Sequence, residues 1–238
     1  MTKVLGVILA RGGSRRVPGK NVKNLLGAPL LAYICRAAGR AALIDRLIIS
    51  TDDDEIMAVA RDNGVEIPFR RPVALAEDVP SEQVTLHALD WVEADDGNSY
   101  DIVVTFQPTT PYVETASIDS CIRQVIDSDA ASCITAHAAS QPPEWQFEIG
   151  DSGEAHPYVA PIDGETGVFQ SLPQRYLPNG AAYATRTSAL RAQSRLIAHP
   201  MRLEVMDDMR SVDIDTPFDW MIAEAVGREG GFGFNDND

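Results

Sequence analysis

The sequence predicts an α/β fold in which a mostly parallel sheet carries helices on both faces. Continuous apolar runs of strand length, which are typical of strands buried on both sides, alternate with segments of helical periodicity. The first of these runs is followed at once by a glycine-rich turn. Strands separated by helices of this length imply βαβ units, so these observations together indicate a parallel sheet.

The first elements follow from short, clear patterns. Val4–Leu9 is an unbroken apolar run and is predicted as a buried strand. Leu30–Ala42 has a helical pattern, and Arg46–Ser50 contains Leu-Ile-Ile, which predicts a second buried strand. Asp53–Asn63 is predicted as a helix that Gly64 terminates.

The middle of the chain continues the alternation. Val65–Phe69 is predicted as a short strand, and Glu82–Glu93 as a helix with Ser81 as its N-cap. Asp101–Phe106 contains Ile-Val-Val-Thr-Phe and is predicted as a third strong strand. Ala116–Asp127 is predicted as the helix that follows it.

The pattern then breaks after one more predicted strand, Ala131–Ala136. Residues 140–178 are rich in Pro, Gly and polar residues and are predicted as an inserted arm of hairpins and loops, which in a compact domain is usually functional or an interface. The alternation resumes with a strand at Gly180–Thr185 and ends with a helix at Pro217–Val226. Residues 227–238 are rich in Gly and Asp and are predicted to be a disordered tail.

Length and charge limit the classes of function. The 238 residues predict one domain over residues 1–226. The chain has 35 Asp and Glu against 20 Lys and Arg, a formal net charge of -15. Nucleic acids and membrane surfaces call for a basic face, so neither is expected as a partner. The acidic balance has two explanations, adaptation to high salt or a codon bias that raises Arg, Asp and Ala.

The cysteines and the N-terminus predict a cytoplasmic protein. Cys35, Cys121 and Cys133 are odd in number, sit in apolar surroundings and lack metal-ligand spacing, which is typical of buried thiols in a reducing compartment. The apolar run Val4–Ala10 is short and meets Arg11 at once, so it does not have the layout of a signal peptide.

The strongest functional signal is the glycine-rich segment Leu9–Asn21, directly after the first predicted strand. Ligands of open α/β sheets bind beyond the carboxyl ends of strands, where glycines let backbone N–H groups approach phosphate oxygens. Five of the 20 Lys and Arg residues lie between Arg11 and Lys23. The segment is neither a Walker A loop nor a dinucleotide fingerprint, and its alternative explanation is a surface turn with solvated charges.

The second signal is Ser211–Thr216. If the chain is extended there, Asp213 and Asp215 project from the same side, which suits a Mg²⁺ that also binds substrate phosphates. The alternative is that Asp215 or Thr216 only caps the helix that begins at Pro217, which does not explain Asp213.

Four weaker segments add polar groups. Taken alone, Ser50–Asp54 is better explained as a helix start and Gln107–Pro111 as a proline-flanked turn. Arg70-Arg71-Pro72 ends a predicted strand with two cations, and Arg175–Gly180 returns the chain to the sheet after the arm.

Together these segments resemble the acylneuraminate cytidylyltransferase family, the CMP-sialic acid synthetases and related CMP-nonulosonate synthetases, over nearly the whole chain. Any one of the motifs is weak, but all of them in this order are specific. They are Ala10–Ser14 with Lys20-Asn21, Ser50–Asp53, Arg71-Pro72 with Leu75–Asp78, Gln107–Pro111, Asn179–Ala181 and Asp213–Thr216.

The resemblance implies a Rossmann-like nucleotide-diphosphosugar-transferase fold and a cytidylyltransferase that moves CMP from CTP to the anomeric hydroxyl of an acidic nine-carbon keto sugar. It also implies a homodimer whose inserted arm reaches the partner's sugar site. The alternatives are a nucleotidyltransferase of the same fold for another sugar, such as ketodeoxyoctonate, and a catalytically silent nucleotide-binding homologue. The identity of the sugar is left open, because the arm matches poorly.

The resemblance also implies roles for individual residues. Arg11 and Lys20 would hold the triphosphate, and Asp213 and Asp215 would hold Mg²⁺, so these four are the expected catalytic residues. Further nucleotide-binding residues would be Ala10, Gly12, Gly13, Ser14, Asn21, Arg71 and Ser81, where the main-chain N–H groups of Gly12, Gly13 and Ser14 face phosphate. The expected sugar-binding residues are Gln107, Thr109, Arg175 and Asn179, with Arg175 aimed at the sugar carboxylate.

Overall fold

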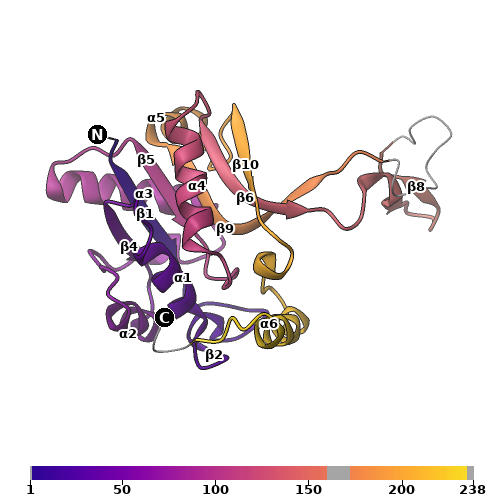
Figure 1. Cartoon of the computed structure of the whole chain (residues 1–238), viewed down its shortest axis with the longest axis horizontal. Coiled ribbons are helices and arrows are strands. Elements are labelled where there is room, and N and C mark those ends of the chain that lie inside the picture. The colour runs from indigo at the N-terminus through magenta and orange to yellow at the C-terminus, as the bar shows by residue number, and fades with distance from the viewer. Residues whose placement is uncertain (1, 160–171, 235–238) are drawn as a thin grey trace.

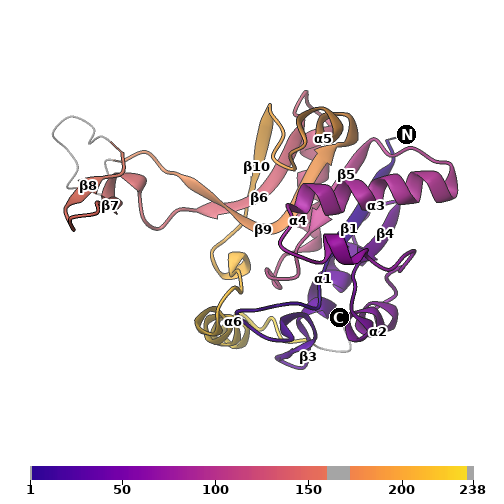
Figure 2. The same ribbon diagram turned by 180° about the vertical axis from the view of Figure 1, so that it is seen from behind.

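A six-stranded sheet forms the centre of the computed structural model, which describes residues 2–159 and 172–234 (Figures 1 and 2). In chain order its strands are β1 (Val4–Leu9), β4 (Arg46–Ser50), β5 (Ile102–Phe106), β6 (Ser132–Ala138), β9 (Tyr176–Arg186) and β10 (Met201–Val205). Their order across the sheet is β10-β6-β9-β5-β1-β4. β1 is parallel to β4 and β5, and β6 to β10, while β9 runs antiparallel between β5 and β6. The predicted mostly parallel sheet is therefore confirmed, with β9 as its antiparallel member.

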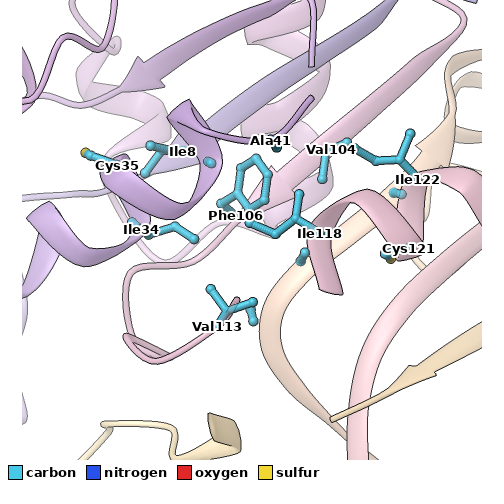
Figure 3. Close-up of a cluster of buried hydrophobic side chains, with 14 of the residues drawn as sticks. Ile8, Ile34, Cys35, Ala41, Val104, Phe106, Val113, Ile118, Cys121 and Ile122 are labelled. Carbon is cyan, nitrogen blue, oxygen red and sulfur yellow. The ribbon is translucent and has the colours of Figure 1, made fainter. Parts of the chain in front are cut away.

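Helices cover both faces of this sheet. They are α1 (Leu30–Gly39), α2 (Asp54–Asp62), α3 (Ser81–Asp96), α4 (Thr115–Ile126), α5 (Thr187–Gln193) and α6 (Pro217–Glu229). Because side chains alternate along a strand, Ile8 of β1 packs with α1, α2 and α4, whereas Leu5 and Val7 pack with α3 and α5 on the opposite face. Figure 3 shows Phe106 of β5 between Ile34 of α1 and Ile118 of α4.

A third apolar cluster ties the ends of the chain to the glycine-rich segment. Val17 and Tyr33 are buried against Ile214 and Trp220, so the start of α6 is packed on the N-terminal region. The tail expected at 227–238 differs from its prediction, because α6 continues to Glu229 and Phe234 stacks edge-on against Tyr33 at 5.3 Å. Residues 235–238 lie outside the described residues.

Three local predictions were wrong. Residues 65–69 form no strand, because only Glu66 bridges to Ile48 of β4. The helix predicted from Glu82 begins at Ser81, and Pro80 precedes it as an N-cap without a side-chain bond, so Ser81 is not a cap. The helix predicted to reach Ala42 ends at Gly39. The strand at residues 65–69 is reduced to one bridge, and the two helices differ from their predictions at their ends, which local pattern encodes least.

Short elements connect the larger ones. The 3₁₀ turns are η1 (Lys20–Val22), η2 (Val73–Leu75), η3 (Pro143–Trp145) and η5 (Met209–Ser211), and a small hairpin pairs β2 (Asn24–Leu25) with β3 (Ala28–Pro29). Across the described ranges 2–159 and 172–234, no helix is both long and apolar enough to cross a membrane. Cys35, Cys121 and Cys133 are free and buried.

Between β6 and β9 the chain leaves the body and returns to it (Figures 1 and 2). At the far end, β7 (Phe147–Ile149) pairs antiparallel with β8 (Ala155–Pro157), and every residue of both strands is exposed. The arm predicted at 140–178 includes residues 160–171, which lie outside the described residues. The described part of the arm is residues 140–159 and 172–178.

Candidate active site

A cavity of about 510 Å³ lies beyond the carboxyl ends of β1 and β5. Such ends are where open α/β sheets bind ligands. Many of the residues predicted to bind nucleotide or sugar meet around it. The predicted residues that line it are Arg11, Ser14, Lys20, Asn21, Arg71, Ser81, Gln107, Thr109 and Asp215.

The glycine-rich segment is held in place by the end of β4. The Gly12 N–H donates to the Asp52 carboxylate at 3.1 Å, and a Cβ on Gly12 would come within 2.5 Å of the Asp53 carboxylate, so only glycine fits there. Asp53 also caps α2 by accepting from the N–H groups of Glu55 and Ile56. The helix start expected within Ser50–Asp54 is therefore confirmed, and the same residues brace the loop.

The loop's backbone donors are partly occupied. The Ser14 N–H donates to the Gly12 carbonyl at 2.9 Å, and the Ala10 N–H donates to the Ser50 carbonyl at 3.2 Å. Ala10, Gly12 and Gly13 do not line the main cavity. Donation from Gly12 and Ser14 to phosphate therefore requires these two amides to exchange partners, and it stays a prediction.

Lys20 and Asn21 face the cavity from η1. The Lys20 ammonium, largely shielded from solvent, donates to the Ile214 carbonyl at 2.6 Å and lies 3.4 Å from the Asp215 carboxylate. The buried Asn21 amide donates to the Arg11 carbonyl at 3.0 Å. These bonds link the glycine-rich loop to the acidic segment 194 residues away from Lys20.

Arg71 is the most deeply buried cation of the site, with 5% of its surface exposed. Its guanidinium donates to the Ser50 hydroxyl at 3.0 Å and to the Ser50 carbonyl at 2.5 Å. Burial lowers the pKa of Arg71 to about 10, against a rise caused by the nearby Asp52. A charge held this far from water is a strong local attractor for an anion.

The two predicted carboxylates lie together but in different settings. Asp213 is exposed to solvent, but the protein crowded around it raises the pKa of its carboxyl, and repulsion from Asp215 adds to the rise. A hydrogen bond from Thr109 and the charge of Lys20 oppose that rise. The segment is not part of the sheet, although the backbone at Val212 is extended, and the two carboxylates are close because they are two positions apart in the chain.

The N-cap of α6 is a separate residue. Thr216 accepts from the Asp219 N–H, and the Asp219 carboxylate accepts from the Thr216 N–H at 2.7 Å, which completes a capping box. The cap explains Thr216 and leaves the Asp213 and Asp215 side chains for another role.

The donor set at this point fits Mg²⁺. Two neighbouring carboxylates that repel each other create a local need for a cation. Within the described residues no three His, Cys, Asp or Glu side chains converge as a metal cluster. A carboxylate pair beside an open cavity suits an ion that keeps waters and takes phosphate oxygens as its other ligands.

The wall opposite the loop is built from the end of β5. Gln107 and Thr109 line the cavity, and Gly180 of β9 comes so close that a Cβ there would be 3.2 Å from the Gln107 amide oxygen. Gly180 has a φ of 81°, which favours glycine on backbone grounds as well. The close approach and the positive φ explain why the chain has a glycine at position 180.

Two predicted sugar-binding residues are not brought to the cavity. Asn179 is buried, and its amide donates to the Ser211 hydroxyl at 3.0 Å, which fixes the start of the acidic segment. Arg175 lies on the arm and pairs with the buried Glu144 at 3.3 Å. In the described structure both side chains support neighbouring segments.

Sequence reasoning missed three charged residues at the rim. Arg15 and Arg11 both pair with Asp78, at 3.1 and 2.6 Å, and Arg16 pairs with Asp215 at 3.1 Å. The density of cations in the loop was visible in the sequence. The role of Asp78 was not, because its partners lie more than 60 positions earlier in the chain.

The sequence profile of the cytidylyltransferase family matches residues 5–152. A CMP-N,N'-diacetyllegionaminic acid synthase of Legionella pneumophila is 28% identical over 94% of this chain and 96% of its own length. N-acylneuraminate cytidylyltransferase B of Danio rerio is 31% identical over 97% of this chain and 53% of its own. A CMP:2-keto-3-deoxy-manno-octonic acid synthetase, solved in complex with CTP, superposes with a TM-score of 0.68 at 18% identity, covering 96% of this chain and all of that one.

Proposed function

The chain belongs to the cytidylyltransferase family, and from that premise we propose that it transfers CMP from CTP to the anomeric hydroxyl of an acidic nine-carbon keto sugar. Pyrophosphate is the second product. Relatives named for N,N'-diacetyllegionaminic acid and N-acylneuraminate support a sugar of the nonulosonate class.

The convergence of charged groups in one cavity carries this proposal. Arg11, Lys20 and Arg71 bring three cations to one cavity, while Asp215 reaches the same space from a segment near the end of the chain. A surface turn with solvated charges would not shield the Lys20 side chain, which is 12% exposed. The arrangement also argues against a catalytically silent homologue, because the groups that neutralise a triphosphate are all present.

The transfer needs positioning and charge neutralisation more than covalent catalysis. The sugar oxygen forms a bond to the α-phosphorus and loses its proton, while the bond from that phosphorus to the bridging oxygen breaks and pyrophosphate leaves. Arg11 and Lys20 hold the departing phosphates, and Arg71 with Asn21 orients the nucleotide. Gln107 and Thr109 contact the sugar.

We propose Mg²⁺ as the cofactor, held by Asp213 and Asp215. When bound there, the ion supplies positive charge to the phosphate oxygens. The two neighbouring carboxylates, of which Asp215 repels Asp213, support this assignment. Lys20, which lies 3.4 Å from Asp215, keeps that carboxylate turned toward the cavity.

We also propose that the protein works as a homodimer through its arm. Phe147, Ile149 and Tyr158 are 62%, 79% and 61% exposed, which is unusual for large apolar side chains gathered on one small hairpin. A second copy is the partner always present at equal concentration. A cytoplasmic location, which the buried free thiols favour, stays a prediction.

One assay tests the activity. Purified protein with Mg²⁺ is incubated with each of the four nucleoside triphosphates and a panel of keto acid sugars, including ketodeoxyoctonate, and pyrophosphate is measured. We expect release only with CTP and a nonulosonate. Release with ketodeoxyoctonate alone would select the alternative sugar, and no release with CTP and any nonulosonate would refute the proposal.

A further inference from the structure

One carboxylate at the cavity rim holds two arginines of the glycine-rich loop. The Asp78 carboxylate accepts from the Arg11 guanidinium at 2.6 Å through one oxygen, and its other oxygen lies 3.1 Å from the Arg15 guanidinium. Asp78 lies on the irregular stretch between η2 and α3, and all three side chains line the same cavity. A single anion bridging two guanidiniums is the arrangement in which arginines also bind phosphate.

The other end of the loop has a different carboxylate. Arg16 and Lys20 pair with Asp215, which is also a proposed Mg²⁺ ligand. Two cations of the loop therefore pair with Asp215, a proposed Mg²⁺ ligand, and the other two, Arg11 and Arg15, pair with Asp78. Asp78 has no proposed role in binding metal or substrate. Phosphates that reach Arg11 and Arg15 must therefore compete with Asp78.

The competition is easily reversed, because the pair is exposed. The Asp78 and Arg15 side chains are 59% and 80% exposed and Arg11 is 32% exposed, and ion pairs that are open to solvent contribute little. The hydrogen bond and charge of Arg11 lower the pKa of Asp78, so the carboxylate stays ionised at neutral pH. A phosphate group with more charge can displace it, and it can return when that phosphate leaves.

We propose that Asp78 is a positioning residue that exchanges places with the phosphates departing as pyrophosphate: it holds Arg11 and Arg15 in the empty site and takes them back during product release. This proposal rests on the proposed function, because it assumes that CTP binds in this cavity. It implies that Asp78 weakens the binding of CTP and pyrophosphate and has little effect on CMP, which lacks the departing phosphates.

The test compares Asp78→Asn with Glu77→Gln. Glu77 lines the same cavity and makes no ion pair with a described residue, so the control removes the same charge without freeing the arginines. Dissociation constants for CTP, pyrophosphate and CMP are measured by calorimetry on wild type and both variants, and the pyrophosphate inhibition constant is measured in the assay. Because Asp78 is exposed, both variants should keep the wild-type melting temperature.

We expect Asp78→Asn to bind CTP and pyrophosphate about 3- to 10-fold more tightly and CMP less than about 2-fold more tightly, while Glu77→Gln changes all three by less than about 2-fold. Equal tightening in the two variants would reduce the effect to bulk charge and overturn the proposal. Weaker pyrophosphate binding in Asp78→Asn would overturn it as well, since Asp78 would then be aligning the arginines for the ligand. If wild type binds none of the three, the proposed function itself fails.

Discussion

The cavity and the arm differ in which kind of side chain is buried and which is exposed. Around the cavity, polar groups that are usually exposed are buried and bonded to the chain's own backbone, as with Arg71 and Asn21, which are 5% and 6% exposed. On the arm, apolar groups that are usually buried lie open, as with Ile149, which is 79% exposed. The cavity has its polar partners within one chain, and the described part of the arm leaves its apolar groups uncovered.

This difference shows which region is complete within one chain and which needs a partner surface. Buried and bonded polar groups such as Arg71 and Asn21 are already oriented before a ligand arrives, so this part of the proposed nucleotide site is preorganised, whereas the Gly12 and Ser14 amides must exchange partners. An exposed apolar hairpin gains stability only when another surface covers it. We therefore expect substitutions at the cavity to act on one chain's chemistry, and substitutions on the arm to act first on assembly.

The largest effect is expected at Asp215. Asp215→Asn should lower kcat by about 10³-fold or more, because the variant removes charge from the point where phosphate and Mg²⁺ are proposed to meet. The melting temperature should remain close to wild type, since Thr216 and Asp219 form the α6 cap without the Asp215 side chain. The measurement is pyrophosphate release at saturating CTP, with thermal unfolding alongside.

Asp208→Asn provides the matched control, because Asp208 belongs to the neighbouring turn and its side chain is 81% exposed. It should retain wild-type turnover. Near-normal turnover in Asp215→Asn would mean that the acidic segment only starts a helix. It would contradict a catalytic role for Asp215 in the cavity.

The next largest effect is expected on the arm, where substitutions should change the oligomeric state before they change the chemistry. Replacing both Phe147 and Ile149 with Asp places two charges on one face of β7. We expect the dimer to dissociate, with the mass in light scattering falling by half, and the KM for the sugar to rise about 10-fold while CTP binding stays within about 2-fold.

Glu148→Gln is the control on the same strand, because alternate residues of a strand face opposite sides. It should leave mass and kinetics unchanged. A monomeric wild type would contradict the dimer. A fully active monomeric variant would show that the sugar side is complete within one chain.

A smaller effect is expected from Arg71→Lys, which keeps the positive charge and removes the planar guanidinium group. Lysine cannot reproduce the two bonds to Ser50, so the buried cation loses its fixed position. We expect the dissociation constant for CTP to rise about 10-fold, measured by calorimetry. The neighbouring Arg70→Lys should change it little, since Arg70 is exposed and pairs with Asp54.

The sequence was sufficient for the layers of the fold and for much of the cavity. Buried strands such as Val4–Leu9 and Arg46–Ser50 are easily recognised because both their faces are apolar, and their bounds were predicted as observed. Arg11, Lys20 and Gln107 could be placed together because each follows a strand that ends at the same edge.

The rest depended on contacts that no local pattern encodes. Asn179 and Arg175 stay predicted as sugar-binding residues, but no local pattern indicates that they bond to Ser211 and Glu144, which are 32 and 31 positions away. The strand expected at residues 65–69 failed because the ladder beside β4 extends to a single bridge at Glu66. Long-range pairing decides such positions.

The smallest effect is expected at Asp213. It tests whether the acidic residues beside the cavity stabilise the ligand-free protein or destabilise it in favour of ligand binding. Burial raises the pKa of Asp213, so its ionisation costs folding stability, and that cost is absent below the unfolded pKa of about 3.9 and complete above the folded pKa. Asp213→Asn should therefore raise the Tm of metal-free protein at pH 7 by on the order of 2 °C, and the gain should shrink toward pH 4.

Asp219→Asn should do the reverse. Burial alone would raise the pKa of Asp219, but hydrogen bonds from Thr216 and from the Asp215 N–H outweigh it and lower that pKa, so the ionised carboxylate stabilises the fold at pH 7 and the stabilisation is lost as pH falls. Thermal unfolding of both variants across pH separates the two. If Asp213→Asn instead lowers the Tm at pH 7, its carboxylate serves the fold before any ligand binds, and the cavity would be built as much for stability as for chemistry.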